Sequence, residues 1–153
     1  MKKALGFFLP ATILLFMFSG CSDATKKREE ISHVPAIKFV SITPSSALKN
    51  SDKVVITFEF IDGNGDLGDN TPDAKNLFCT DSRNSVTYEY RIPQLAPDNA
   101  NIIIKGNQAF ELPAQGFIDD THITETATYT IYIKDRQGNQ SNTITTDVLT
   151  IHQ

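Results

Sequence analysis

VVITFEFI, residues 54–61, is the stretch that decides the fold. Positions 54, 56, 58 and 60 are all apolar, whereas Thr57 and Glu59 stand between them. An apolar side chain at every second position lines one face of an extended strand. The stretch therefore predicts a β-strand whose regular apolar face packs into a core.

The same period of two recurs along the rest of the chain. Further strands are expected over residues 37–43, 86–92, 101–105, 109–112, 127–134 and 143–151. The pair 101–105 and 109–112 flanks Gly106-Asn107, and the alternation in 143–151 changes phase, which suggests a β-bulge. Helical periodicity after residue 35 never exceeds one or two turns. Seven short strands within about 115 residues predict an all-β fold, an antiparallel β-sandwich of about seven strands.

The N-terminal residues carry a targeting signal. Lys2 and Lys3 precede an apolar run from Ala4 to Phe18, and Cys21 follows small residues. This order is typical of a secretory signal peptide. The run is short for a transmembrane helix, which needs about 20 apolar residues. The stretch FSGC, residues 18–21, resembles the lipobox of bacterial lipoproteins, although Phe18 stands where leucine is usual. The resemblance implies cleavage before Cys21 and lipidation of its thiol; an ordinary cleaved signal is the alternative.

These features divide the chain into three parts. We expect a lipoprotein signal peptide over residues 1–20, a lipid-anchored tether over 21–33 and one β-sandwich domain over 34–153. Cleavage would remove Lys2 and Lys3, and the net charge would fall from −4 to about −6. An acidic chain argues against nucleic-acid binding, which requires a basic face. We expect a monomer held to the membrane by its acyl chains.

Two turn motifs carry a further resemblance. The stretch DRQGNQSN, residues 135–142, is similar to the last hairpin of bacterial Ig-like domains, and DGNGDLG occupies residues 62–68. Together they resemble small Ig-like lipoproteins of bacteria. The resemblance implies an Ig-like sandwich and no particular activity.

The acidic glycine loop is the candidate ion site. Asp62, Asn64 and Asp66 place oxygen-bearing side chains at alternate positions, and Asp69 follows. Ca²⁺ takes six to eight oxygen ligands, and glycines allow a loop to curl around it. In an Ig-like topology the 135–142 loop reaches the same end, so Asp135 becomes a further candidate ligand. Leu67 stands where an EF-hand requires glycine, and an ordinary glycine turn is the alternative interpretation.

Catalytic motifs are missing from the sequence, and the three histidines are scattered. Cys79 has no partner cysteine if Cys21 is lipidated, and its apolar neighbours predict a buried structural thiol. We therefore expect a non-enzymatic interaction module of the cell envelope, with a possible protein partner there. A lipoprotein that binds a glycan or small ligand is the alternative. Ser22 directly after Cys21 favours the outer over the inner membrane.

Overall fold

The computed structural model describes residues 31–153. The signal peptide, Cys21 and the tether through residue 30 lie outside the described residues. Over the described part the chain forms ten strands and no helix, so the all-β prediction is confirmed. No described segment forms an apolar helix long enough to cross a membrane.

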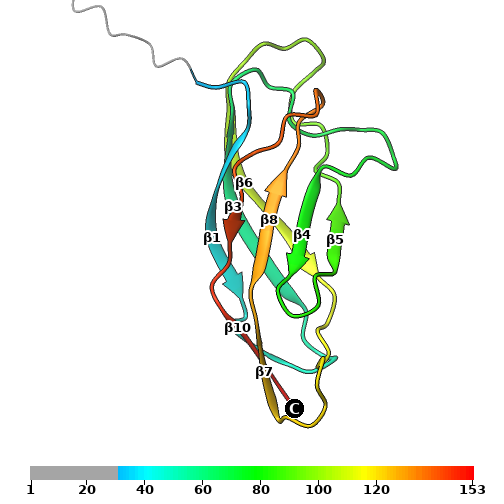
Figure 1. The fold of residues 1–153 in the computed structure, drawn as a ribbon. Coiled ribbons are helices and arrows are strands. Elements are labelled where there is room, and N and C mark those ends of the chain that lie inside the picture. Colours follow the sequence, from blue (N-terminus) through cyan, green and yellow to red (C-terminus); the bar gives the residue numbers. More distant parts are fainter. Residues whose placement is uncertain (1–30) are drawn as a thin grey trace, which may run out of the picture.

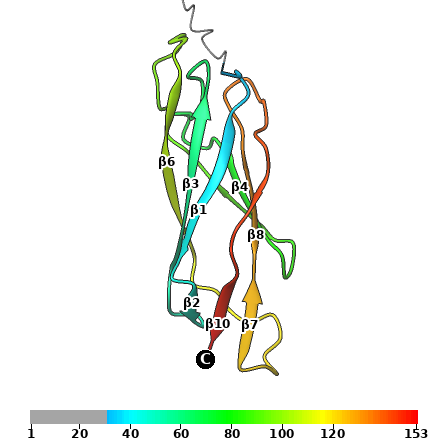
Figure 2. The ribbon, with the colours of Figure 1, turned by 90° about the vertical axis from the view of Figure 1, so that its left-hand side faces the viewer.

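Two sheets face each other and form a β-sandwich (Figures 1 and 2). The first has the order β1-β3-β6 and consists of β1 (Ala36–Thr43), β3 (Val54–Asp62) and β6 (Ile104–Leu112). The second has the order β5-β4-β8-β9 and consists of β4 (Leu77–Asp81), β5 (Thr87–Tyr90), β8 (Tyr129–Ile133) and β9 (Ile144–Thr145). Every pair of neighbouring strands within these two sheets is antiparallel.

A smaller third sheet lies at the end away from the tether (Figure 2). It has the order β2-β10-β7 and consists of β2 (Ser46–Leu48), β7 (Thr124–Ala127) and β10 (Leu149–His152). Strand β10 runs parallel to β2 and antiparallel to β7. The C-terminus is therefore at the remote end, whereas residue 31 is at the opposite end (Figure 1).

The core lies between the two facing sheets. The inward positions of β3 and β8 are buried along the whole of each strand, and Phe58 and Ile131 are both 0% exposed. Burial of such a side chain contributes about 1.5–3 kcal/mol to folding. The inward face of β3 ends with Asp62, which is also 0% exposed. The alternation that builds the core thus carries a carboxylate into the interior where the acidic loop begins.

Some predicted strand boundaries are wrong. Residues 101–105 and 109–112 do not form two strands, because β6 continues through Gly106. Strand β4 was not predicted as a strand. The predicted strand over 127–134 is preceded by the separate strand β7 in another sheet. The phase change in residues 143–151 is a change of sheet: β9 pairs with β8, whereas β10 pairs with β2 and β7.

Candidate functional site

Asp62 is the first buried acid of the acidic loop. Its Oδ2 accepts a hydrogen bond of 3.1 Å from the Leu67 amide, whereas Oδ1 has no hydrogen-bond partner. Burial raises the pKa of Asp62, and the nearby charge of Asp66 raises it further. Three nearby backbone amides, those of Leu67, Asn64 and Asp66, act in the opposite direction and lower the pKa of Asp62. Of these, the amides of Asn64 and Asp66 are near the carboxylate but make no full hydrogen bond with Oδ1. The environment therefore disfavours a bare negative charge on Asp62.

Asp66 and Asn64 complete a set of buried oxygens without partners. Asp66 is only 9% exposed, and neither of its carboxylate oxygens accepts a hydrogen bond. The side-chain Oδ1 of Asn64 is also buried and has no partner. With Asp62 Oδ1, the loop holds four such oxygens within five residues. Buried polar atoms in folded proteins are nearly always paired, so this group needs an explanation.

Two neighbouring segments hold the acidic loop in place. Gly65 has a φ of 76°, and a Cβ there would lie 2.9 Å from the carbonyl oxygen of Ile102, so this position requires glycine. From the β8–β9 hairpin, the Arg136 amide donates to Asp66 O at 3.1 Å, and Arg136 Nη1 donates to Gly68 O at 2.8 Å. The carbonyl of Gly68, which a bound ion could otherwise use, is thus occupied.

The 135–142 loop does reach the acidic loop, as the predicted topology requires. Leu67 and Asp135 form an isolated antiparallel bridge between the two loops. Sequence reasoning missed Arg136 as the residue that clamps the loop. The resemblance of residues 135–142 to an Ig-like hairpin predicts where this loop lies, but no local pattern indicates a contact across about seventy residues.

Asp69 and Asp135 are close in sequence or space to this group, but three of their four carboxylate oxygens accept hydrogen bonds within their own turns. Asp69 Oδ1 accepts the Thr71 amide at 2.7 Å, which lowers the pKa of Asp69. The two oxygens of Asp135 accept the amide and the side-chain Nδ2 of Asn139, both at 2.8 Å. Both acids line a cavity of about 330 Å³ that neither Asn64 nor Asp66 lines. The structure thus brings Asp62, Asn64 and Asp66 together and points Asp69 and Asp135 to their own turns.

A second cavity, of about 560 Å³, is lined in part by Asn64 and Asp66. It is lined by residues from four segments, namely His33, Asn64, Asp66, Asp98, Asn99, Ala100, Asn101, Arg136 and Gln137. Within residues 31–153, no three side chains of His, Cys, Asp or Glu converge as a metal-binding group. The four unpartnered oxygens of this loop belong to two carboxylates and one side-chain amide, so only two of the three side chains are acids. Amide oxygens are ordinary ligands of Ca²⁺.

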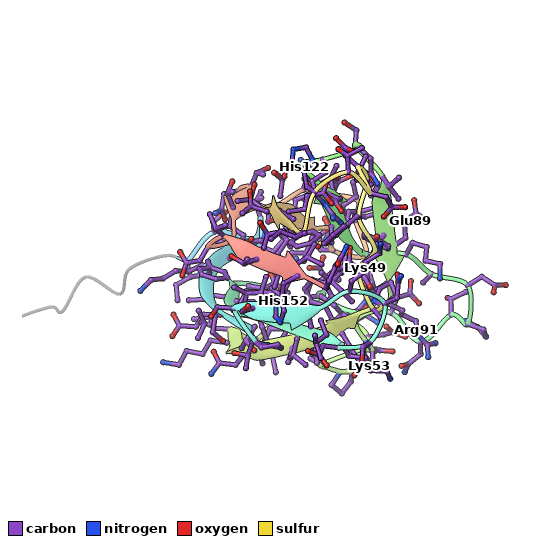
Figure 3. The ribbon with its side chains drawn as sticks, turned by 90° about the horizontal axis from the view of Figure 1, so that it is seen from below. Lys49, Lys53, Glu89, Arg91, His122 and His152 are labelled. Atoms are coloured by element: carbon purple, nitrogen blue, oxygen red, sulfur yellow. The ribbon has the colours of Figure 1, made fainter. Side chains whose placement is uncertain are left out.

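In the part of the chain that the structure describes, the histidines and the one cysteine do not assemble into a site. His122 lies 3.1 Å from Asp119 on the surface, and His152 lies 3.2 Å from Ser46 Oγ. His152 ends β10 and His122 lies just before β7, so both belong to the end with the small sheet, which faces the viewer in Figure 3. Cys79 is buried, as the sequence predicts, and burial raises its pKa to about 12. Its thiol therefore stays protonated at neutral pH.

The tyrosines do not gather into one concave patch, which is the arrangement that a glycan site would favour. Tyr88 and Tyr90 face inward and pack against the core, and Tyr129 is fully buried. Tyr132 lies on the outer face of the second sheet, where its ring stacks on Phe78 with a centroid distance of 4.8 Å. Stacking on Phe78 covers one face of the Tyr132 ring.

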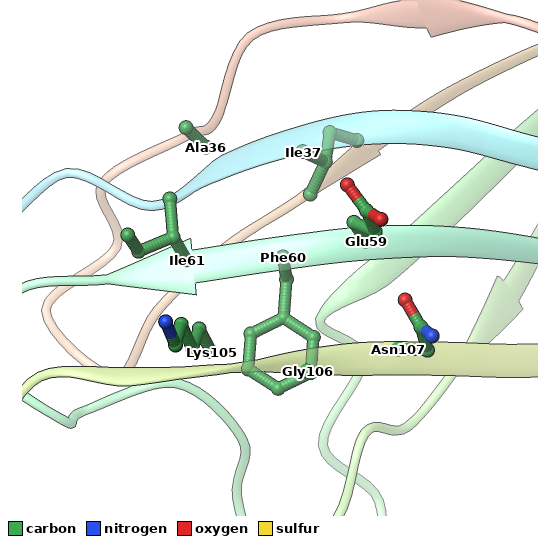
Figure 4. Close-up of a pocket in the computed structure, with 8 residues that line it drawn as sticks. All are labelled: Ala36, Ile37, Glu59, Phe60, Ile61, Lys105, Gly106 and Asn107. Carbon is green, nitrogen blue, oxygen red and sulfur yellow. The ribbon is translucent and has the colours of Figure 1, made fainter.

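A further cavity of about 590 Å³ lies at the tether end of the first sheet (Figure 4). It is lined by Ala36, Ile37, Glu59, Phe60, Ile61, Lys105, Gly106 and Asn107. The Phe60 ring lies over Gly106, and a Cβ at Gly106 would be 3.3 Å from that ring (Figure 4). Its lining has two charged side chains, Glu59 and Lys105, and none of the buried oxygens without a partner.

No family model matches the chain, and neither a curated protein nor a solved structure matches it. The acidic loop and the N-terminal sequence are therefore the features from which we infer a function.

Proposed function

We propose that this protein is a lipid-anchored, non-catalytic Ig-like interaction module of the cell envelope that takes up Ca²⁺ in its acidic loop. The single observation that supports the ion is the group of four buried oxygens without partners on Asp62, Asn64 and Asp66. Such oxygens lose their hydration on folding and gain no full hydrogen bond within the protein. A hard cation with oxygen ligands restores that loss and neutralises both carboxylates.

The donor set favours Ca²⁺ of modest affinity. Three side chains supply at most four oxygens, and backbone carbonyls or water would complete the six to eight that Ca²⁺ takes. Extracellular Ca²⁺ modules have Kd values of about 10⁻⁴–10⁻³ M. An ion site of this strength is consistent with the envelope, where a secreted protein meets external Ca²⁺.

The anchor part of the proposal comes from the N-terminal sequence. Lipidation of Cys21 would attach the chain to a bilayer, and Ser22 favours the outer membrane. The proposed role is the binding of an envelope protein by a module held close to the membrane. The end of the sandwich that carries the acidic loop also receives the tether, since the Gly63 amide donates to Ser32 O at 3.0 Å.

Thermal unfolding tests the ion. The full mature chain in detergent micelles is melted with excess EDTA and with 10 mM CaCl₂. Binding to the folded state alone raises stability by RT ln(1 + [L]/Kd), about 1.4–2.7 kcal/mol for this range of Kd. We therefore expect Ca²⁺ to raise Tm by several degrees.

Two variants make the melting experiment specific. The double variant Asp62→Asn, Asp66→Asn removes both charges at nearly constant shape and should lose the Ca²⁺-dependent rise. Asp69→Asn is the matched control, because the Asp69 carboxylate accepts the Thr71 amide instead of facing the unpartnered group. The Asp69→Asn variant should keep the Ca²⁺-dependent rise in Tm. Loss of that rise would mean that Asp69 is also a ligand. An equal rise in the wild type and the double variant would exclude the proposed site.

Detergent partition tests the anchor. Cys21→Ala removes the only thiol in the lipobox-like stretch, so we expect this variant to leave the detergent phase for the aqueous phase. The wild-type chain should remain in the detergent phase. A Cys21→Ala variant that partitions like the wild type would place the anchor elsewhere.

A further inference from the structure

Residues 31 and 32 cross the backbone of the acidic loop just before the chain enters the sandwich. The Gly63 amide donates to the carbonyl of Ser32 at 3.0 Å. A Cβ on residue 63 would lie 2.5 Å from Ser32 O and closer still to Ile31 O, so glycine alone permits this approach. The segment 31–34 is therefore packed directly against the loop backbone, before β1 begins at Ala36.

This crossing point lies within the group of unpartnered oxygens. Gly63 stands between Asp62 and Asn64, each of which has a buried side-chain oxygen without a partner. His33, the residue that follows Ser32, lines the same cavity of about 560 Å³ as Asn64 and Asp66. Residues 62–66 therefore contact the tether through the Gly63 amide and also carry the side chains that would hold the ion.

The charges of Asp62 and Asp66 link the proposed ion site to the contact between Gly63 and Ser32. Without a cation, the carboxylates of Asp62 and Asp66 repel each other, and repulsion favours any opening that separates residues 62–66. Such an opening moves Gly63 and breaks its hydrogen bond with Ser32. A divalent cation between the carboxylates would reverse this preference, because the ion binds only the closed loop.

We propose that Ca²⁺ held by Asp62, Asn64 and Asp66 fastens residues 31–34 to the domain, so that the ion sets how much chain separates the sandwich from its anchor. This inference rests on the proposed function, since both require the same ion. Release of the crossing would free the four residues 32–35, which precede β1 at Ala36. At about 3.3–3.6 Å per residue, the reach of the tether would grow by about 13–14 Å.

Amide hydrogen exchange at Gly63 measures this directly. The full mature chain in detergent micelles is followed by NMR with excess EDTA and with 10 mM CaCl₂. If the wild-type crossing is released through opening of the acidic loop, which loses the ion, exchange of the Gly63 amide slows by the factor 1 + [L]/Kd, about 11- to 100-fold. The Gly138 amide, which donates to Asp135 O at 3.1 Å, is the internal control and should change less than twofold.

Gly63→Ala separates the tether contact from the ion. The added Cβ would clash with the backbone of Ile31 and Ser32, so we expect it to break the crossing directly, without opening the loop. We expect this variant to keep its Ca²⁺-dependent rise in Tm, while the amide of residue 63 becomes insensitive to Ca²⁺. Asp66→Asn should lose both effects.

The outcomes distinguish this inference from the proposed function. If Ca²⁺ raises the Tm of the wild-type chain but leaves exchange at Gly63 unchanged, the ion site stands and the fastening is wrong. If Ca²⁺ shifts neither quantity, both proposals fail. The wild-type exchange rates decide the question even if Gly63→Ala does not fold.

Discussion

Asp66 and Asp135 are two buried acids at one end of the sandwich with opposite surroundings. Asp135 is 6% exposed, and both of its oxygens accept hydrogen bonds from Asn139. Asp66 is 9% exposed, and neither of its oxygens has a partner. Burial alone therefore does not mark a carboxylate as a candidate ligand; unsatisfied lone pairs do.

The sequence predicted which acids cluster, but not which of them are free to bind. Oxygens at alternate positions of a glycine loop converge for local reasons, so Asp62, Asn64 and Asp66 could be grouped from the sequence. The engagement of Asp69 by the amide two residues later is also local, and the spacing Asp69-x-Thr71 is a usable sign of it. The clamp by Arg136 depends on tertiary structure and has no such sign.

Arg83 lies in a buried ion-pair network at the remote end of the molecule. Its guanidinium donates to Asp81 Oδ2 at 2.7 Å and to Glu125 Oε2 at 3.0 Å, and the Asp81 side chain is 0% exposed. Arg83→Ala leaves the Asp81 charge uncompensated, so we expect a loss of about 3–5 kcal/mol in urea denaturation. The matched control is Lys53→Ala, which breaks an exposed pair with Glu111 and should cost about 0–1 kcal/mol. Equal costs for both variants would contradict this account of Arg83.

Among the elements, β3 could be predicted well because one face of it is buried without interruption. Strand β4 was missed, since its outward Phe78 is apolar and its inward Asp81 is charged. Phe78 stacks on Tyr132 outside the core, and Asp81 pairs with Arg83 inside it. Long-range partners of this kind reverse the local pattern on which a strand prediction depends.

Strand β6 differs from the prediction for a related reason. Gly106 and Asn107 are good turn residues, and a turn was expected there. In the structure Gly106 pairs with Phe60 of β3, whose ring covers the space above the glycine. A neighbouring aromatic residue compensates for the missing side chain, so the strand continues.

Substitutions on the two faces of β3 test the predicted period. Phe58 is 0% exposed and contacts Phe110 edge to face, so Phe58→Ala should cost about 3–5 kcal/mol through lost transfer energy and a cavity. Thr57 points outward on the same strand, and Thr57→Ala should change stability by less than about 1 kcal/mol. Chemical denaturation of the full chain measures both. A large loss for Thr57→Ala would mean that this face is also packed.

The whole molecule has two ends that differ in chemistry. The tether, the acidic loop and its unpartnered oxygens are at one end, whereas the C-terminus and the small sheet β2-β10-β7 are at the other (Figures 1 and 2). The buried acid at the remote end, Asp81, is neutralised by Arg83 within the protein. Among the described residues, unpartnered buried carboxylate oxygens occur only at the end where residue 31 enters the sandwich.

Calorimetric titration of the full mature chain with CaCl₂, in detergent micelles, tests the central claim most directly. The account predicts saturable binding of one Ca²⁺ per chain with a Kd of about 10⁻⁴–10⁻³ M. It also predicts that the double variant Asp62→Asn, Asp66→Asn gives only the heat of dilution. A wild-type chain without saturable heat up to 10 mM CaCl₂, or a double variant that binds as tightly as the wild type, would contradict the account.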